Sequence, residues 1–170
     1  MGVDAARPRI AVFCATQRGH RLVQRLLETV PGADLLVVSF PEDPWEPPYL
    51  DDIRQTARNG GGQFVRSRNP ATGQARAILD AQPPDLMLAV NWRYMLPPEV
   101  YRRPRRGAYI FHDSLLPEYR GFSPTVWAII NGEDHTGVTL FAIADEVDAG
   151  EYLLNRAGAG RGVADDWDAA

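Results

Sequence analysis

The most informative absence in this sequence is lysine, because all 18 of its basic residues are arginine. Pyridoxal phosphate and Schiff-base enzymes need a lysine amine, and the phosphate-binding Gly-x-x-x-x-Gly-Lys loop contains one. The composition therefore excludes both kinds of site.

Cysteine is almost absent, and no long apolar run is present. The single cysteine, Cys14, cannot form an intrachain disulfide, which is typical of a protein of the reducing cytoplasm. We expect Cys14 itself to be a small buried hydrophobe. No stretch reaches the roughly 18 apolar residues that span a membrane, and the N-terminus lacks the order of a signal peptide. The net charge of -4 predicts no attraction of the whole molecule to nucleic acid. We therefore expect a cytoplasmic protein with neither membrane nor nucleic-acid partners.

The glycine-rich loop of dinucleotide-binding proteins is also missing. Residues 14–19, after the first predicted strand, contain one glycine, whereas the fingerprint Gly-x-Gly-x-x-Gly needs three. Gly158, Gly160 and Gly162 match its start superficially, but no helix pattern follows them. We expect no NAD or flavin site.

Three carboxylates near the end of the chain, Asp165, Asp166 and Asp168, suggest a metal site at first sight. No histidine or cysteine lies beside them to complete a ligand shell. We therefore expect a solvated tail and no metal.

Strand and helix signals alternate along the rest of the sequence. Strands are predicted at 9–13, 35–40, 63–65, 85–90, 107–111 and 136–141, with a last one starting at 152–154. Helices are predicted at 20–30, 49–58, 72–81, 96–101 and 123–131, and residues 157–162 are expected to begin an irregular tail. This alternation predicts an α/β fold with a Rossmann-like, doubly wound, mostly parallel sheet of about seven strands, in a single domain over residues 1–170.

The most informative motif surrounds His112. This histidine follows an apolar strand and precedes a Ser-Leu-Leu-Pro turn, while Asp148 lies on an Asp-Ala-Gly turn after the next strand. Open α/β sheets bind ligands at the carboxyl ends of their strands, so His112 and Asp148 form a candidate acid/base pair. The residues alone leave a structural histidine equally open.

Four arginines between two predicted elements, Arg102, Arg103, Arg105 and Arg106, allow two interpretations. They precede their strand, at the opposite sheet edge from His112, which favours a solvated connection over a phosphate-binding site.

The ordered motifs of the second half of the chain resemble the folate-dependent formyltransferases. They are His112-x-Ser-Leu-Leu-Pro-x-Tyr-Arg-Gly121, Thr136-Gly-Val-Thr139 and Asp145-Glu-x-Asp-x-Gly150. The family includes the methionyl-tRNA, glycinamide ribonucleotide and sugar-nucleotide amine formyltransferases. The likeness is dense from Gly107 to Leu154 and weaker from Arg9 to Pro98.

The resemblance implies a donor, an acceptor and a set of site residues. The donor is 10-formyltetrahydrofolate, the acceptor is an amine, and His112 and Asp148 match the catalytic pair. The segments that border the pterin in the family match Tyr94, Met95, Leu96, Ile143, Ala144, Asp145 and Val147. The residues expected near the formyl group and the acceptor are Ile110, Ser114, Leu115, Pro117, Tyr119 and Arg120.

One position departs from the family pattern. The family has an asparagine two positions before the histidine, and its amide donates to the oxyanion; here that position is Ile110. Loss of one oxyanion donor typically lowers the rate about a hundred- to a thousandfold. Asn91 and Asp113 are candidates for a substitute donor. A hydrolase of the formyl donor, and a degenerate homologue that binds folate without turnover, are the alternatives.

The sequence ends soon after its last predicted strand. It lacks the C-terminal helix usual for the family core and the extra domain of the tRNA formyltransferases, so we expect a core truncated at its C-terminus. We expect the acceptor to be a small molecule, such as a nucleotide sugar, an amino acid or a biosynthetic intermediate, and a homodimer to cover the exposed sheet edge.

Overall fold

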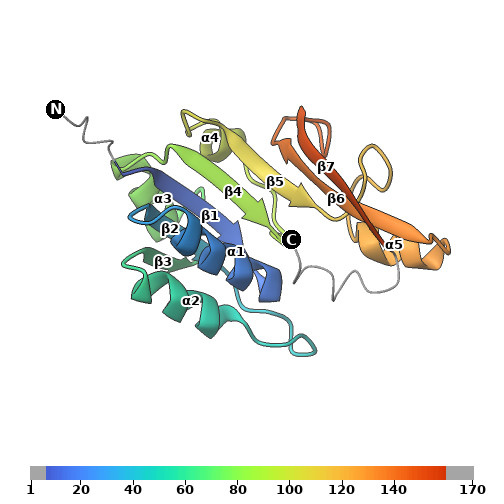
Figure 1. Cartoon of the computed structure of the whole chain (residues 1–170). Coiled ribbons are helices and arrows are strands. Elements are labelled where there is room, and N and C mark those ends of the chain that lie inside the picture. The colour runs from blue at the N-terminus through green and yellow to red at the C-terminus, as the bar shows by residue number, and fades with distance from the viewer. Residues whose placement is uncertain (1–6, 160–170) are drawn as a thin grey trace. The chain divides into compact units, whose positions relative to one another are not determined.

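The computed structural model describes residues 7–159, shown in Figure 1. The strands of this part are β1 (Arg9–Cys14), β2 (Asp34–Ser39), β3 (Gln63–Arg66), β4 (Leu86–Val90), β5 (Ala108–His112), β6 (His135–Ala142) and β7 (Tyr152–Ala159). The helices are α1 (Thr16–Thr29), α2 (Leu50–Asn59), α3 (Gly73–Ala81), α4 (Pro98–Tyr101) and α5 (Pro124–Ile130). The seven strands and the alternating helices confirm the predicted α/β class.

The chain divides after Ala108 into two compact units. In the first unit the strands follow the order β3-β2-β1-β4, and all pairs are parallel. Every residue of β1 is buried, as expected of a strand that is covered on both faces. Helices α1 and α2 cover one face and α3 the other, as right-handed crossovers from a central strand require (Figure 1). This arrangement confirms the predicted doubly wound parallel sheet.

The second unit contains β5, β6 and β7, in that order, and α5. Both strand pairs are antiparallel, so the protein combines parallel and antiparallel strands. His112 of β5 lies opposite Thr139 of β6, and Thr139 lies opposite Asn155 of β7. This row of three side chains crosses the sheet beside the turn that follows His112.

Element boundaries differ from the predictions by more than two residues at two places. Helix α1 begins at Thr16 rather than at residue 20, and β7 continues to Ala159, although residues 157–159 were expected to be irregular. The cause in β7 is pairing: Ala157 lies opposite Gly137 and Ala159 opposite His135. Small residues carry little strand propensity, so the partner strand determines their conformation.

Within residues 7–159, no helix has the length and apolar composition needed to cross a membrane.

Candidate active site

His112 ends β5, and its side chain is buried. The ring Nε2 lies 2.9 Å from the backbone oxygen of Tyr119, and Nδ1 lies 3.7 Å from Oδ2 of Asp148. A carbonyl oxygen only accepts hydrogen bonds, so Nε2 carries a proton in this arrangement. The protein thus places an acceptor opposite each ring nitrogen, and Nδ1 is the nitrogen that faces the carboxylate.

Asp148 lies on the loop between β6 and β7. Its backbone is left-handed, with φ of 50°, a conformation that aspartate tolerates better than most residues. Its Oδ2 accepts a hydrogen bond of 2.7 Å from the backbone N–H of Gly121. A side chain at Gly150, two residues on, would overlap the backbone carbonyl of Ala142, which explains the glycine of the Asp-Ala-Gly turn.

The turn between His112 and Gly121 is held by a network of buried and partly buried hydrogen bonds. The Ser114 hydroxyl donates to the backbone oxygen of Glu118 over 2.6 Å, so this serine stabilises the turn. The Thr139 hydroxyl accepts from the N–H of Leu116 and lies 2.7 Å from the oxygen of Ser114. The amide oxygen of Asn155 lies 2.8 Å from the same hydroxyl. Strands β6 and β7 therefore fix the base of the turn.

Sequence reasoning assigned no role to Thr139 or Asn155. Thr139 belongs to the Thr-Gly-Val-Thr motif, and this motif was the only sequence signal that pointed to it. The contact of Thr139 with the turn depends on the register between β5 and β6. No local pattern distinguishes Asn155 from any other polar residue of a strand.

The other residues expected near the reaction centre lie around this turn. Ile110 is half-buried, and because strand residues two apart share a face, it lies on the same face of β5 as His112. Leu115 is half-buried and Pro117 exposed. The pKa of the exposed Arg120 is raised, mainly by its hydrogen bond to Tyr152 and also by nearby negative charges, including that of Asp148.

The segments expected to border a pterin lie one in each unit. In the second unit, residues 143–147 follow β6, and Val147 is exposed. In the first unit, Leu96 is buried, Met95 is 76% exposed, and the ring of Tyr94 packs edge-on against Phe40. Met95 and Val147 therefore present exposed apolar side chains, while Tyr94 and Leu96 support the fold.

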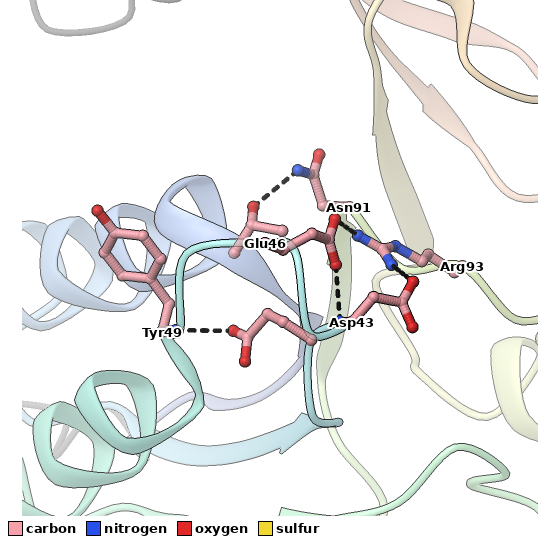
Figure 2. A network of polar contacts seen from close by, with 7 residues as sticks. Asp43, Glu46, Tyr49, Asn91 and Arg93 are labelled. Atoms are coloured by element: carbon pink, nitrogen blue, oxygen red, sulfur yellow. Dashed lines mark hydrogen bonds and ion pairs between the residues drawn. The ribbon is translucent and has the colours of Figure 1, made fainter.

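Figure 2 shows the surroundings of Asn91, one candidate for a substitute oxyanion donor. Its amide nitrogen donates to the hydroxyl of Thr16 over 2.8 Å. Nearby, Arg93 pairs with both Glu46 and Asp43. The amide of Asn91 thus has a partner within its own unit.

Asp113, the other candidate, directly follows His112 and is half-buried. An ionised carboxylate only accepts hydrogen bonds, so Asp113 would act as a donor only in its protonated form.

Among residues 7–159, no group of three or more His, Cys, Asp or Glu side chains is arranged to hold a metal ion. Gly160 and Gly162, with the three carboxylates Asp165, Asp166 and Asp168, lie outside the described residues.

Comparison with known proteins identifies relatives of the chain. Residues 9–158 match the family model described as formyl transferase. The methionyl-tRNA formyltransferase of Chlorobium limicola is 38% identical over 107 residues, which are 63% of this chain and 33% of that protein. The chain thus spans about a third of the length of this curated relative.

Solved structures show the same fold. Glycinamide ribonucleotide transformylase 1 from Symbiobacterium toebii superposes with a TM-score of 0.70 at 19% identity, covering 92% of this chain and 75% of that chain. A formyltetrahydrofolate deformylase from Pseudomonas syringae superposes with a TM-score of 0.70 at 20% identity, covering 91% of this chain and 52% of that chain.

Proposed function

This chain belongs to the formyl transferase family, and we propose that it transfers the formyl group of 10-formyltetrahydrofolate to the amine of a small molecule. The observation that carries the proposal is the approach of His112 Nδ1 to Asp148 Oδ2 at 3.7 Å, inside the region that the family model matches. A histidine and a carboxylate so arranged can exchange protons with a reacting amine.

The first half of the proposed reaction, the addition of the amine, needs two proton movements. The uncharged amine attacks the formyl carbon, a carbon–nitrogen bond forms, and negative charge develops on the formyl oxygen. The protonated Nδ1 of His112 donates to that oxygen, and Asp148 accepts the proton that the attacking nitrogen releases. The C=O bond then re-forms as the bond to N10 of the folate breaks: the formyl oxygen returns its proton to Nδ1 of His112, N10 takes up the proton held by Asp148, and the formylated amine and tetrahydrofolate leave.

The charge of the second unit supports a small acceptor. Residues 109–170 contain three arginines against eleven aspartates and glutamates. Such an excess of negative charge in the sequence repels a polyphosphate chain and attracts a protonated amine. The relative from Chlorobium limicola is named a methionyl-tRNA formyltransferase, so an aminoacyl-tRNA acceptor is the competing proposal.

Exposed apolar side chains support the proposed donor. Met95 is 76% exposed and Val147 is 55% exposed, and the family resemblance assigns both to segments that border the pterin. Covering the apolar surface of either side chain with a flat ring is favourable, by about 25 cal/mol per Å².

The test is a formyl-transfer assay with donor labelled in the formyl group. We expect label in a formylated amine from a panel of amino sugars, amino acids and aminoacyl-tRNA, and a loss of transfer of at least a hundredfold in His112→Ala and Asp148→Ala. Circular dichroism checks that both variants are folded.

Three outcomes would contradict the proposal. Free labelled formate without a formylated amine indicates the hydrolase. Folate binding without turnover indicates a degenerate binding protein. Label in aminoacyl-tRNA alone indicates the macromolecular acceptor.

A further inference from the structure

The backbone of Tyr119 has an unusual conformation. Its φ is +54°, in the left-handed region where an L-residue with a bulky side chain is strained. Glycine adopts this region without strain, yet a tyrosine occupies the position. Its side chain must therefore contribute something that offsets the strain.

The phenol of Tyr119 is held at the end of α5. Its hydroxyl donates to Oε1 of Glu133 over 2.6 Å and accepts from the amide nitrogen of Asn131 over 3.2 Å. The hydrogen bond to Glu133 is also the main reason why the pKa of the phenol is raised. These contacts fix the side chain, and through it the orientation of the peptide group that follows.

That peptide group faces His112. The carbonyl oxygen of Tyr119 accepts from Nε2 of His112 over 2.9 Å, and two residues later the N–H of Gly121 donates to Asp148 over 2.7 Å. The segment 119–121 thus contacts both members of the candidate pair. A proton held on Nε2 leaves Nδ1 as the nitrogen that exchanges its proton with Asp148 or a substrate.

We propose that Tyr119 is a positioning residue: its hydroxyl, anchored on Glu133 and Asn131, holds its backbone carbonyl against Nε2 of His112 and thereby selects the Nε2–H tautomer. The contribution of Tyr119 to formyl transfer rests on the proposed function. The selection of the tautomer does not, because it is a property of the folded protein.

The test compares variants that differ by single groups. Tyr119→Phe removes the hydroxyl alone, and Glu133→Ala removes its acceptor from outside the turn. Glu133→Gln keeps an acceptor oxygen at that place and is the matched control. Tyr49→Phe removes a phenol hydroxyl from the first unit and controls for the loss of that group.

The readout is the ¹⁵N NMR spectrum of the His112 ring, recorded where its shifts no longer change with pH. The signal is assigned as the one missing in His112→Gln, because the chain has 3 histidines. We expect the Nε2–H tautomer, with an exchange-protected Nε2 proton, in the wild type, in Glu133→Gln and in Tyr49→Phe. We expect Tyr119→Phe and Glu133→Ala to lose that protection and to show a mixture of tautomers.

Kinetics provide a second readout. Loss of one anchoring hydrogen bond should lower kcat about tenfold, with KM for the folate unchanged.

A protected Nε2 proton in both Tyr119→Phe and Glu133→Ala would overturn the proposal. If Tyr119→Phe fails to fold, Glu133→Ala alone decides. The NMR measurement needs no turnover, so it tests the role of Tyr119 even if the protein does not transfer formyl groups. Failure of the proposed function can therefore be distinguished from failure of this proposal.

Discussion

At the scale of single residues, neighbouring groups control the chemistry of each titratable side chain. His112 has an acceptor opposite each ring nitrogen, and Asp148 is held by the N–H of Gly121. Cys14 shows the opposite case, because complete burial raises the pKa of its thiol to about 12. A thiol with such a pKa is not a nucleophile at neutral pH, which agrees with the expectation of a small buried hydrophobe.

Ile110 is the residue whose replacement is most informative. If the protein is a formyltransferase that lacks one oxyanion donor, Ile110→Asn should raise kcat, because Ile110 shares a face of β5 with His112. The measurement is kcat for formyl transfer, with Ile110→Val as a conservative control.

Stability must be measured beside the rate in this experiment. An unsatisfied amide at a half-buried position costs about 1–3 kcal/mol, so melting temperatures of both variants are needed. A folded Ile110→Asn protein that transfers more slowly than the wild type would contradict the idea of a missing donor. Loss of activity in Asn91→Ala or Asp113→Ala, with Ile110→Asn neutral, would assign the donor to one of those residues.

At the scale of elements, the candidate site depends on how β6 and β7 hold two loops. Thr139 and Asn155 fix the turn after His112, while the N–H of Ala142 donates to the oxygen of Glu151 and closes the loop that carries Asp148. Both loops therefore depend on the pairing of the same two strands.

Gly150→Ala tests this dependence. The new methyl group would overlap the backbone of Ala142, so the loop must shift or the strands must separate. We expect a loss of about 3 kcal/mol in the free energy of unfolding, at the upper end of the range for overpacking. Urea denaturation measures it.

Gly158→Ala is the matched control, because Gly158 lies in β7 with open space around its Cα. We expect a change within about 0.5 kcal/mol there. Equal stability of the two variants would show that the close approach at Gly150 is unimportant.

At the scale of the whole molecule, charge is distributed unevenly along the chain. Residues 1–108 contain fifteen arginines against eleven aspartates and glutamates, the reverse of the balance in residues 109–170. Several of these arginines form ion pairs. In the connection before β5, Arg103 pairs with Asp80 and Arg105 pairs with Asp85. A solvated connection was expected here: Arg105 is exposed, whereas Arg103 is half-buried.

The ion pairs predict how stability depends on pH. The pKa of Glu46 is lowered from 4.5, mainly by its hydrogen bond to Arg93, and the pKa of Asp85 is lowered from 3.8, mainly by Arg105. A carboxylate whose pKa is lower in the folded state stabilises that state above the unfolded pKa. This contribution disappears as the pH falls through the folded value.

We therefore expect the free energy of unfolding to decrease as the pH falls below about 4.5. The difference between wild type and Glu46→Gln should be constant from pH 5 to 7 and shrink at lower pH, as measured by urea denaturation at each pH. A difference that stays constant down to pH 3 would contradict the role of the Glu46–Arg93 pair.

The order of the elements, the position of His112 at the end of a strand and that of Asp148 on the loop after the next strand were predictable from the sequence. Apolar runs and helical periodicity are local signals, and they located each of the strands and helices found within residues 7–159. The absence of lysine excluded two kinds of chemistry without any structure. These conclusions needed no knowledge of which distant residues are in contact.

Only the tertiary structure decided which groups surround His112. The register of β5, β6 and β7 brings Thr139 and Asn155 to the turn, and a left-handed backbone at Tyr119 turns its carbonyl toward Nε2. The physical reason is that strand register and backbone conformation at a turn depend on packing and hydrogen bonds between residues far apart in the chain, which leave no periodic trace in the sequence.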